Sequence, residues 1–174
     1  VSQKHPPLLV PGLSKDSDYR IITSTRLPFA INMPDFMRSS GFENVDELEV
    51  DNANLDLIDE LPEIENFVIV SNTYGYNAIA VAPYAVVNRA WVFLADKTNV
   101  DEIDAILSSR NPDEILIYGF VDVEVRETLQ KYNPKIINND DRFKDNIQIV
   151  QEYMKIKPVD QIVLSNGEFI EREV

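Results

Sequence analysis

The sequence predicts an α/β fold, a mostly parallel sheet with helices on both of its faces. The first observation is a series of short, continuous apolar runs, such as residues 67–71 and 115–118, which are typical of strands buried on both faces. The second is that segments with apolar residues at helical spacing follow most of these runs. The third is that the links are short, as between parallel strands joined by right-handed crossovers.

The N-terminal third begins with a proline-rich segment. Prolines disfavour both helix and strand, so we expect residues 1–18 to form an extended lead-in or linker. Apolar runs predict strands at residues 19–23 and 46–50. Helical patterns predict a helix at residues 29–38, despite an internal proline, and a short helix at residues 55–61.

The central part has the strongest strand pattern. Residues 67–71 form a continuous apolar strand, and residues 76–87, rich in Ala and Val, form a buried helix. Residues 91–95 are the next strand. We expect Asn99 to cap the following helix, with Glu102 three residues later, as in a capping box.

The last part continues the alternation, which is of the flavodoxin-like or Rossmann-like kind. Strands are expected at residues 115–118, 135–137 and 162–164. Asp122 is expected to cap the helix after the first of these. Apolar residues at helical spacing over residues 143–154 predict the last helix, which a following proline ends.

The composition excludes several classes of function. A formal net charge of −14 disfavours nucleic acid and anionic membrane surfaces as partners, because both attract clustered Lys and Arg. The chain has no cysteine and a single histidine, His5, which excludes thiolate chemistry, a Ser-His-Asp triad and a multi-histidine metal site. Its five glycines are too scattered for a phosphate-binding loop, and no apolar run is long enough to span a membrane. We therefore expect no cofactor, no metal and no catalytic residues.

Part of the pattern occurs more than once. The Ile-Val-Ser-Asn phrase at residues 69–72 returns as Val-Leu-Ser-Asn at residues 163–166, and residues 21–24 are a weaker copy. Residues 47–65 and 135–160 also share a strand, an Asp/Asn turn and a helix. The alternative for the weaker copy is that buried strands simply resemble one another.

These matches suggest how the chain is organised. After the lead-in, we interpret residues 19–66 as a shortened strand–helix unit. We interpret residues 67–174 as a full unit followed by a returning strand. Together they are expected to form one compact domain.

The order and spacing of motifs over residues 67–160 resemble the type 2 cell wall-binding repeat. Residues 82–85 (Ala-Pro-Tyr-Ala) match its Ala-Pro-Leu-Ala-like helix, and residues 92–95 its second strand. Residues 117–120 match its third strand, and residues 139–145 its Gly-x-Asp-Arg-Tyr-x-Thr phrase. The chain departs from the pattern within the last two motifs, where Phe120 and Asn139 replace Gly, Phe143 replaces Tyr and Asp145 replaces Thr.

The resemblance implies a non-enzymatic module, usually in groups of three, that attaches proteins non-covalently to cell-envelope polymers. It implies an extracellular, cell-surface or envelope location, a cell-envelope polymer or surface-layer component as partner, and possible self-association. Many such polymers are anionic, and a net charge of −14 suits them poorly unless a divalent cation bridges the two. The alternative is an intracellular α/β domain that binds a small molecule or a partner protein. An enzyme using carboxylates at strand ends is a third reading, for which no acid–base pair can be placed.

Four residues are candidates for contacts with a ligand or between units. Tyr74 and Tyr76 follow a strand and can stack on a sugar ring or pack at a rim. Asp140 and Asp141 follow a strand, and one of this pair can cap the last helix, or they can take part in a site at the strand ends. The resemblance implies a packing role between units for Arg142. Asp96 also follows a strand, as in a receiver domain, but residues 22–25 lack the acidic pair such domains need.

Overall fold

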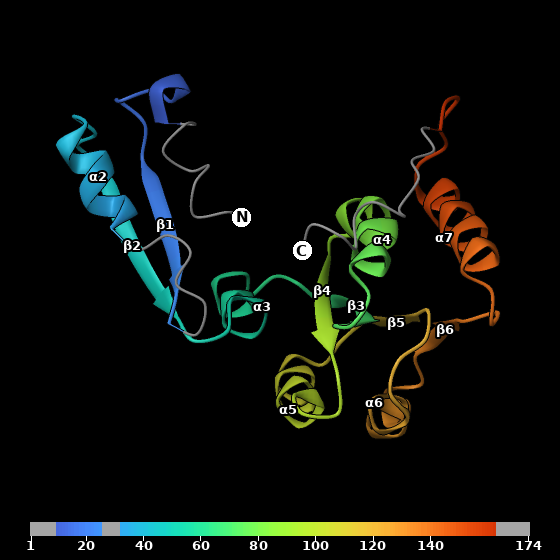
Figure 1. The fold of residues 1–174 in the computed structure, drawn as a ribbon. Coiled ribbons are helices and arrows are strands. Elements are labelled where there is room, and N and C mark those ends of the chain that lie inside the picture. Colours follow the sequence, from blue (N-terminus) through green and yellow to red (C-terminus); the bar gives the residue numbers. More distant parts are fainter. Residues whose placement is uncertain (1–9, 26–31, 163–174) are drawn as a thin grey trace. The chain divides into compact units, whose positions relative to one another are not determined.

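The computed structural model describes residues 10–25 and 32–162, which form two compact units (Figure 1). The first unit ends at Asp59 and the second begins at Glu60, close to the boundary expected after residue 66. The returning strand expected at residues 162–164 lies almost entirely outside the described residues, as does the first half of the lead-in. None of the described helices is both long enough and apolar enough to cross a membrane.

The first unit is a strand–helix–strand segment with a parallel two-stranded sheet, in which Tyr19 lies opposite Val45. Its helix packs on the second strand around the buried side chain of Met37. Pro34 is tolerated because it lies in the first turn, where no N–H is needed for a helical hydrogen bond. The elements are η1 (Val10–Gly12), β1 (Tyr19–Ser24), α2 (Met33–Ser39), β2 (Val45–Val50), α3 (Ala53–Asp56) and η2 (Leu57–Glu60).

The second unit is a parallel four-stranded sheet with the order β4-β3-β5-β6. Helices alternate with the strands along the chain, as predicted. The elements are β3 (Asn66–Ser71), α4 (Gly75–Val87), β4 (Ala90–Ala95), α5 (Val100–Arg110), β5 (Glu114–Tyr118), α6 (Val123–Leu129), η3 (Gln130–Tyr132), β6 (Lys135–Ile137) and α7 (Arg142–Ile156).

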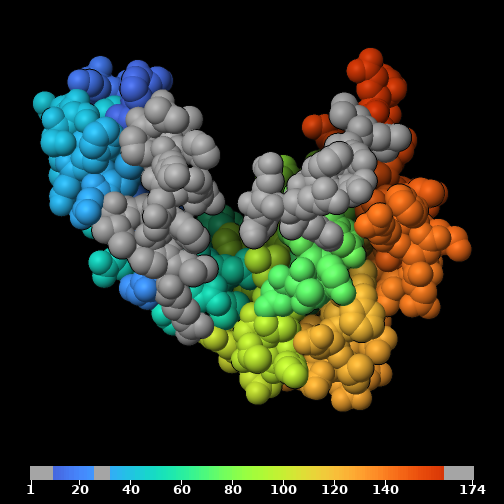
Figure 2. Space-filling view, viewed as in Figure 1, coloured from blue at the N-terminus to red at the C-terminus, as the bar shows by residue number. Residues whose placement is uncertain are grey.

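Helices cover both faces of this sheet, so the predicted α/β fold class is confirmed. Helices α4 and α7 lie together on one face, and α5 and α6 lie on the other (Figures 1 and 2). Residues 67–70 of β3 alternate between the two faces and are all fully buried, which explains their continuous apolar run. Val68 and Val70 pack in the core beneath α4 and α7. The Phe67 ring stacks on Phe93 at 5.7 Å.

One of the three expected helix caps is present. The Asp141 carboxylate accepts hydrogen bonds from the backbone N–H groups of Phe143 at 2.9 Å and Lys144 at 3.4 Å, so Asp141 is the member of the Asp140–Asp141 pair that caps α7.

The predicted side-chain caps at Asn99 and Asp122, and the predicted capping box with Glu102, are wrong. Asn99 lies at the start of α5, but its side chain accepts from the Asp96 N–H and donates to the Leu94 carbonyl. Asp122 lies at the start of α6, and its carboxylate accepts from the Lys97 N–H at 3.0 Å. Both side chains bond to the turn after β4 instead of to their own helices.

The apolar residues of α7 do not all face the core. Ile149 packs beneath the helix and is 2% exposed, whereas Phe143 is 65% exposed and Ile147 is 60% exposed. The helical spacing of these residues predicts the helix correctly, but part of its apolar surface faces solvent.

Candidate functional site

The strand order places a crevice at the carboxyl edge of the second sheet. From β3 the chain moves through α4 to β4 on one side, and later through α5 to β5 on the other side of β3. Ligands of open α/β sheets bind where the order reverses in this way, because the two connections leave the edge on opposite faces. The segments that follow β3, β5 and β6 meet at this edge.

A cavity of about 250 Å³ opens there, and we call it the carboxyl-edge cavity. Its lining combines one arginine with aromatic, amide and carboxylate side chains and one glycine. Three of the four predicted site residues, Tyr76, Asp141 and Arg142, are among them. The lining residues are Tyr76, Asn77, Gly119, Phe120, Asn138, Asp140, Asp141, Arg142 and Asp145.

The four predicted residues form one cluster. Tyr74, just before α4, has its ring centroid 5.5 Å from that of Tyr76, with the planes tilted by 35°. The Arg142 guanidinium lies 5.8 Å from the Tyr76 ring centroid and 5.1 Å from that of Phe143, within range of a cation–π interaction. Helices α4 and α7 thus bring together residues that are far apart in the sequence. Tyr76 packs against Tyr74 and Arg142 and also lines the cavity. Its position therefore fits both rim packing and stacking on a sugar ring.

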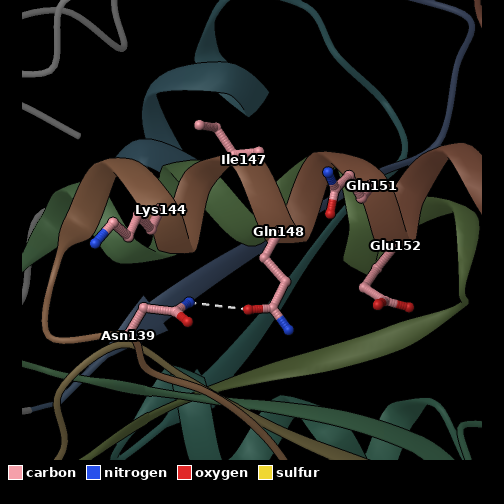
Figure 3. Close-up of a pocket in the computed structure, with 6 residues that line it drawn as sticks. All are labelled: Asn139, Lys144, Ile147, Gln148, Gln151 and Glu152. Atoms are coloured by element: carbon pink, nitrogen blue, oxygen red, sulfur yellow. Dashed lines mark hydrogen bonds between the residues drawn. The ribbon is translucent and has the colours of Figure 1, made fainter.

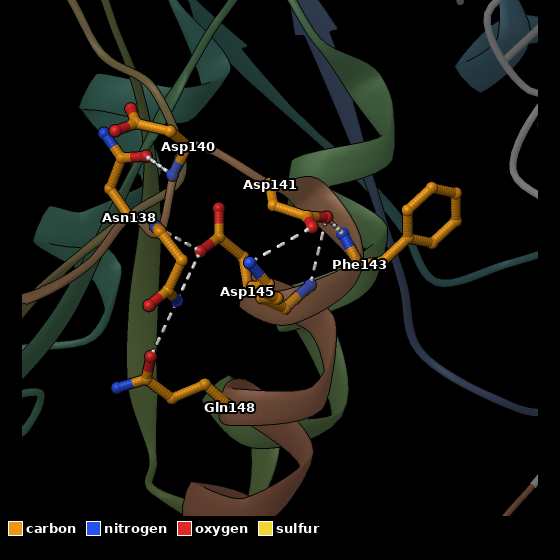
Figure 4. Close-up of polar contacts among 8 residues, drawn as sticks. Asn138, Asp140, Asp141, Phe143, Asp145 and Gln148 are labelled. Carbon is orange, nitrogen blue, oxygen red and sulfur yellow. Dashed lines mark hydrogen bonds and ion pairs between the residues drawn. The ribbon is translucent and has the colours of Figure 1, made fainter.

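A hydrogen-bonded turn forms the polar side of the cavity (Figure 4). The Asp145 carboxylate is 4% exposed and accepts two hydrogen bonds from Asn139, from the backbone N–H at 2.7 Å and from Nδ2 at 2.8 Å. Asn139 also donates to Gln148 at 2.9 Å. Asp140 adopts a positive φ of 55° and donates its N–H to Asn138. The Phe143 ring points away from these polar groups.

Tyr118 ends β5 next to this turn. Its hydroxyl donates to Asn146 Oδ1 at 2.6 Å, which ties β5 to α7. Burial, and then the nearby Asp145 carboxylate, raise the pKa of Tyr118 well above its usual range. The phenol therefore stays protonated and remains a hydrogen-bond donor.

Position 119 requires glycine because of its backbone conformation and because the Asn77 side chain lies close to it. Its φ is 70°, and a Cβ at this position would lie 3.0 Å from the side-chain nitrogen of Asn77. Asn77 itself is 3% exposed and lines the cavity from the first turn of α4. A side chain at position 119 would displace Asn77.

Sequence reasoning missed Asn77, Phe120 and Asp145 as lining residues. The signal for Phe120 was its position directly after a strand. Asn77 and Asp145 lie in the first turns of helices whose N-termini point to the carboxyl edge. Neither signal is useful until the order of the strands is known.

Asp96, the residue that resembles a phosphoacceptor, is engaged in a turn. Its carboxylate accepts from the Thr98 hydroxyl and N–H, each at 2.6 Å, and from the N–H of Asn99 at 3.2 Å. Asn72 donates to the other oxygen. The hydrogen bond from the Thr98 side chain is the main cause of a lowered pKa of Asp96. These bonds favour a structural role for Asp96, joining the ends of β3 and β4.

A second hollow of about 270 Å³ runs along α7 (Figure 3). It is lined by Asn139, Lys144, Ile147, Gln148, Gln151 and Glu152. Glu152 already pairs with Lys135 at 2.6 Å and with Lys155 at 2.8 Å. None of the four predicted site residues lines this hollow.

The carboxyl-edge cavity offers hydrogen-bond donors, acceptors and aromatic surface to a small polar group. Within residues 10–25 and 32–162, no three acidic or histidine side chains are grouped as a metal site would require. Comparisons with protein-family models, with curated proteins and with solved structures found no match to this chain.

Proposed function

We propose that this chain is a non-catalytic module of the cell surface that attaches to a cell-wall or surface polymer through the carboxyl-edge cavity. One observation carries the proposal: aromatic, amide, carboxylate and guanidinium groups converge on one cavity at the reversal point of a parallel sheet. The resemblance to wall-binding repeats supplies the kind of ligand.

The bonding of the carboxylates supports binding over catalysis. A carboxylate pair that transfers protons needs two groups free to act on one reacting atom. Here Asp141 caps α7, and Asp145 accepts both hydrogen bonds from Asn139. Both are used to hold the turn in shape.

Matching hydrogen bonds in the two units support a repeated module. In the first unit, the N–H of Thr25 donates to the Val50 carbonyl at 2.8 Å, just after the parallel pair β1 and β2. In the second unit, the N–H of Asn72 donates to the Ala95 carbonyl at 3.1 Å, just after the parallel pair β3 and β4. The chain thus closes each strand–helix–strand segment in the same way.

The side chains of the same residues also match. The Thr25 hydroxyl donates to the Asp51 carboxylate at 3.0 Å, and the Asn72 amide donates to the Asp96 carboxylate. These bonds favour matching β2 with β4, rather than with residues 135–160 as the sequence suggested. We therefore propose that the first unit corresponds to the β3–α4–β4 part of the second.

Co-sedimentation with isolated envelopes tests the function. Purified protein is mixed with envelopes from the cells that produce it, with and without calcium, and centrifuged. We expect the wild type in the pellet, a several-fold lower bound fraction for Arg142→Gln and Tyr76→Ala, and no change for Arg126→Gln, which removes an exposed arginine from α6. Wild-type protein that stays in the supernatant in both conditions would overturn the proposal.

A second candidate is an intracellular α/β domain that binds a small molecule. The mixture of polar and aromatic groups around one cavity favours it, although about 250 Å³ is below the roughly 300–1,000 Å³ typical of pockets that enclose whole ligands. A small polar metabolite would fit as well as one unit of a polymer. Failure to bind envelopes, together with a cavity-dependent shift of the melting temperature by small metabolites, would favour this candidate.

A further inference from the structure

We infer that the carboxyl-edge cavity recognises one uncharged, hydroxyl-rich sugar residue that stacks on Phe120. This inference rests on the proposed attachment to an envelope polymer and names the chemical class of the polymer unit. Four features of the cavity support it.

The first feature is size. A cavity of about 250 Å³ takes a small group and cannot enclose a longer segment of a polymer. One sugar ring entering from a chain that continues outside the protein matches these dimensions.

The second feature is the mixture of donors and acceptors. The carboxamides of Asn77 and Asn138 can donate and accept, the carboxylate of Asp140 only accepts, and the guanidinium of Arg142 only donates. A sugar hydroxyl does both, so neighbouring hydroxyls can satisfy this whole set. A phosphate or carboxylate ligand cannot donate to Asp140, and an ammonium ligand would face Arg142.

The third feature is the aromatic surface beside the polar groups. Phe120 lines the cavity while 60% of its surface is exposed, so its ring is accessible to a ligand. Tyr74, 37% exposed, lies against the lining residue Tyr76. The C–H face of a sugar ring can cover an exposed aromatic ring while its hydroxyls reach the polar side.

The fourth feature is charge. Asp140, Asp141 and Asp145 line the cavity, while Arg142 and Lys144, which lies 3.8 Å from Asp141, are the nearby cations. The whole chain carries a net charge of −14. A polyanion would be repelled by the protein at long range and would gain little inside the cavity. An uncharged sugar avoids both costs.

Competition with fractionated polymer tests the inference. Polymer released from the envelopes is separated by anion exchange into uncharged and acidic fractions, and each competes with envelopes for the wild-type protein. We expect the uncharged fraction to release the protein at low and at high salt alike, because the interaction is not between net charges. We expect Phe120→Ala to weaken binding of this fraction about tenfold, the loss of one aromatic stacking contact. Phe36→Ala, which removes an exposed phenylalanine of the first unit, should leave binding unchanged.

The outcomes separate this inference from the proposed function. If only the acidic fraction competes, and salt abolishes the competition, envelope attachment stands and the uncharged-sugar inference is overturned. If the uncharged fraction competes but Phe120→Ala binds like the wild type, stacking on Phe120 is overturned. If the wild type does not sediment with envelopes at all, the proposed function itself fails. A urea midpoint for Phe120→Ala equal to that of the wild type excludes unfolding as the cause of lost binding.

Discussion

Asn139 donates two hydrogen bonds to a single carboxylate oxygen of Asp145, from its backbone nitrogen at 2.7 Å and from its side chain at 2.8 Å. The pair closes the turn between β6 and α7, and Asp145 lines the carboxyl-edge cavity. Because Asp145 is 4% exposed, water has little access to replace it as the acceptor.

Replacing Asp145 with alanine should therefore lower stability. A buried hydrogen bond to a charged group contributes about 1.5–3 kcal/mol, so we expect a loss of that order in the free energy of unfolding of Asp145→Ala in urea. Asp145→Asn keeps an acceptor oxygen and should lose less. Glu127→Ala, an exposed position on α6, should be within about 0.5 kcal/mol of the wild type. Equal losses for all three variants would contradict the role assigned to the pair.

Asp96 should make stability depend on pH in the acidic range. Its pKa is lower in the folded protein than its ordinary value, mainly because the Thr98 side chain donates a hydrogen bond to it. A lowered folded pKa means that Asp96 contributes stability above its unfolded pKa, and that this contribution is lost as pH falls through the folded pKa. Urea midpoints of Asp96→Asn should therefore fall less steeply than those of the wild type below about pH 4. Asp101→Asn, at an exposed position of α5, is the control, and parallel curves for Asp96→Asn and the wild type would refute the prediction.

Two isoleucines of α7 should respond very differently to truncation. Ile149 is 2% exposed against the sheet, so Ile149→Ala should cost about 2–5 kcal/mol, the usual range for emptying a buried site. Ile147 is 60% exposed, so Ile147→Ala should change stability by less than about 1 kcal/mol. Chemical denaturation of the two variants compares the same substitution on the same helix. Similar losses at both positions would show that the outer face of α7 is covered.

Gly119 should not tolerate a side chain. Its φ of 70° alone costs an L-residue about 1–2 kcal/mol, and an added Cβ would lie 3.0 Å from the Asn77 side chain. Gly119→Ala should lower the melting temperature and also reduce envelope binding, because Asn77 lines the cavity. Gly75→Ala is the matched control, since nothing lies within 4 Å of a Cβ at the start of α4. A melting temperature of Gly119→Ala equal to that of Gly75→Ala would contradict this prediction.

Much of the fold could be predicted because its signals are local. The apolar run at residues 67–71 identifies β3, and the acidic pair before a helical pattern predicts the cap that Asp141 forms. The same reasoning failed for Asn99 and Asp122. The Asn99 side chain bonds instead to Leu94 and Asp96, a few residues earlier in the chain. The Asp122 carboxylate accepts from Lys97, in a turn that the crossover between strands brings beside it.

The site could be predicted only in part. Tyr74, Tyr76 and Asp141 follow strands in the sequence, and the family resemblance indicates Arg142. The structure gathers all four in one cluster. Phe120 and Asn77 were missed because each becomes a cavity residue only when β3 and β5 are neighbours. Along the chain β3 is followed by β4, and no sequence pattern near β5 indicates that it pairs with the other side of β3.

Apolar periodicity and turn chemistry thus established the alternation of strands and helices and the parallel sheet, because these depend on near neighbours in the chain. Packing settled the rest. The strand order β4-β3-β5-β6, the burial of Ile149 with the exposure of Ile147, and the cavity beside Phe120 all depend on contacts between distant segments. The physical reason is that helices must cover both faces of the sheet at once, and this decides where each strand lies and which polar groups meet at its edge.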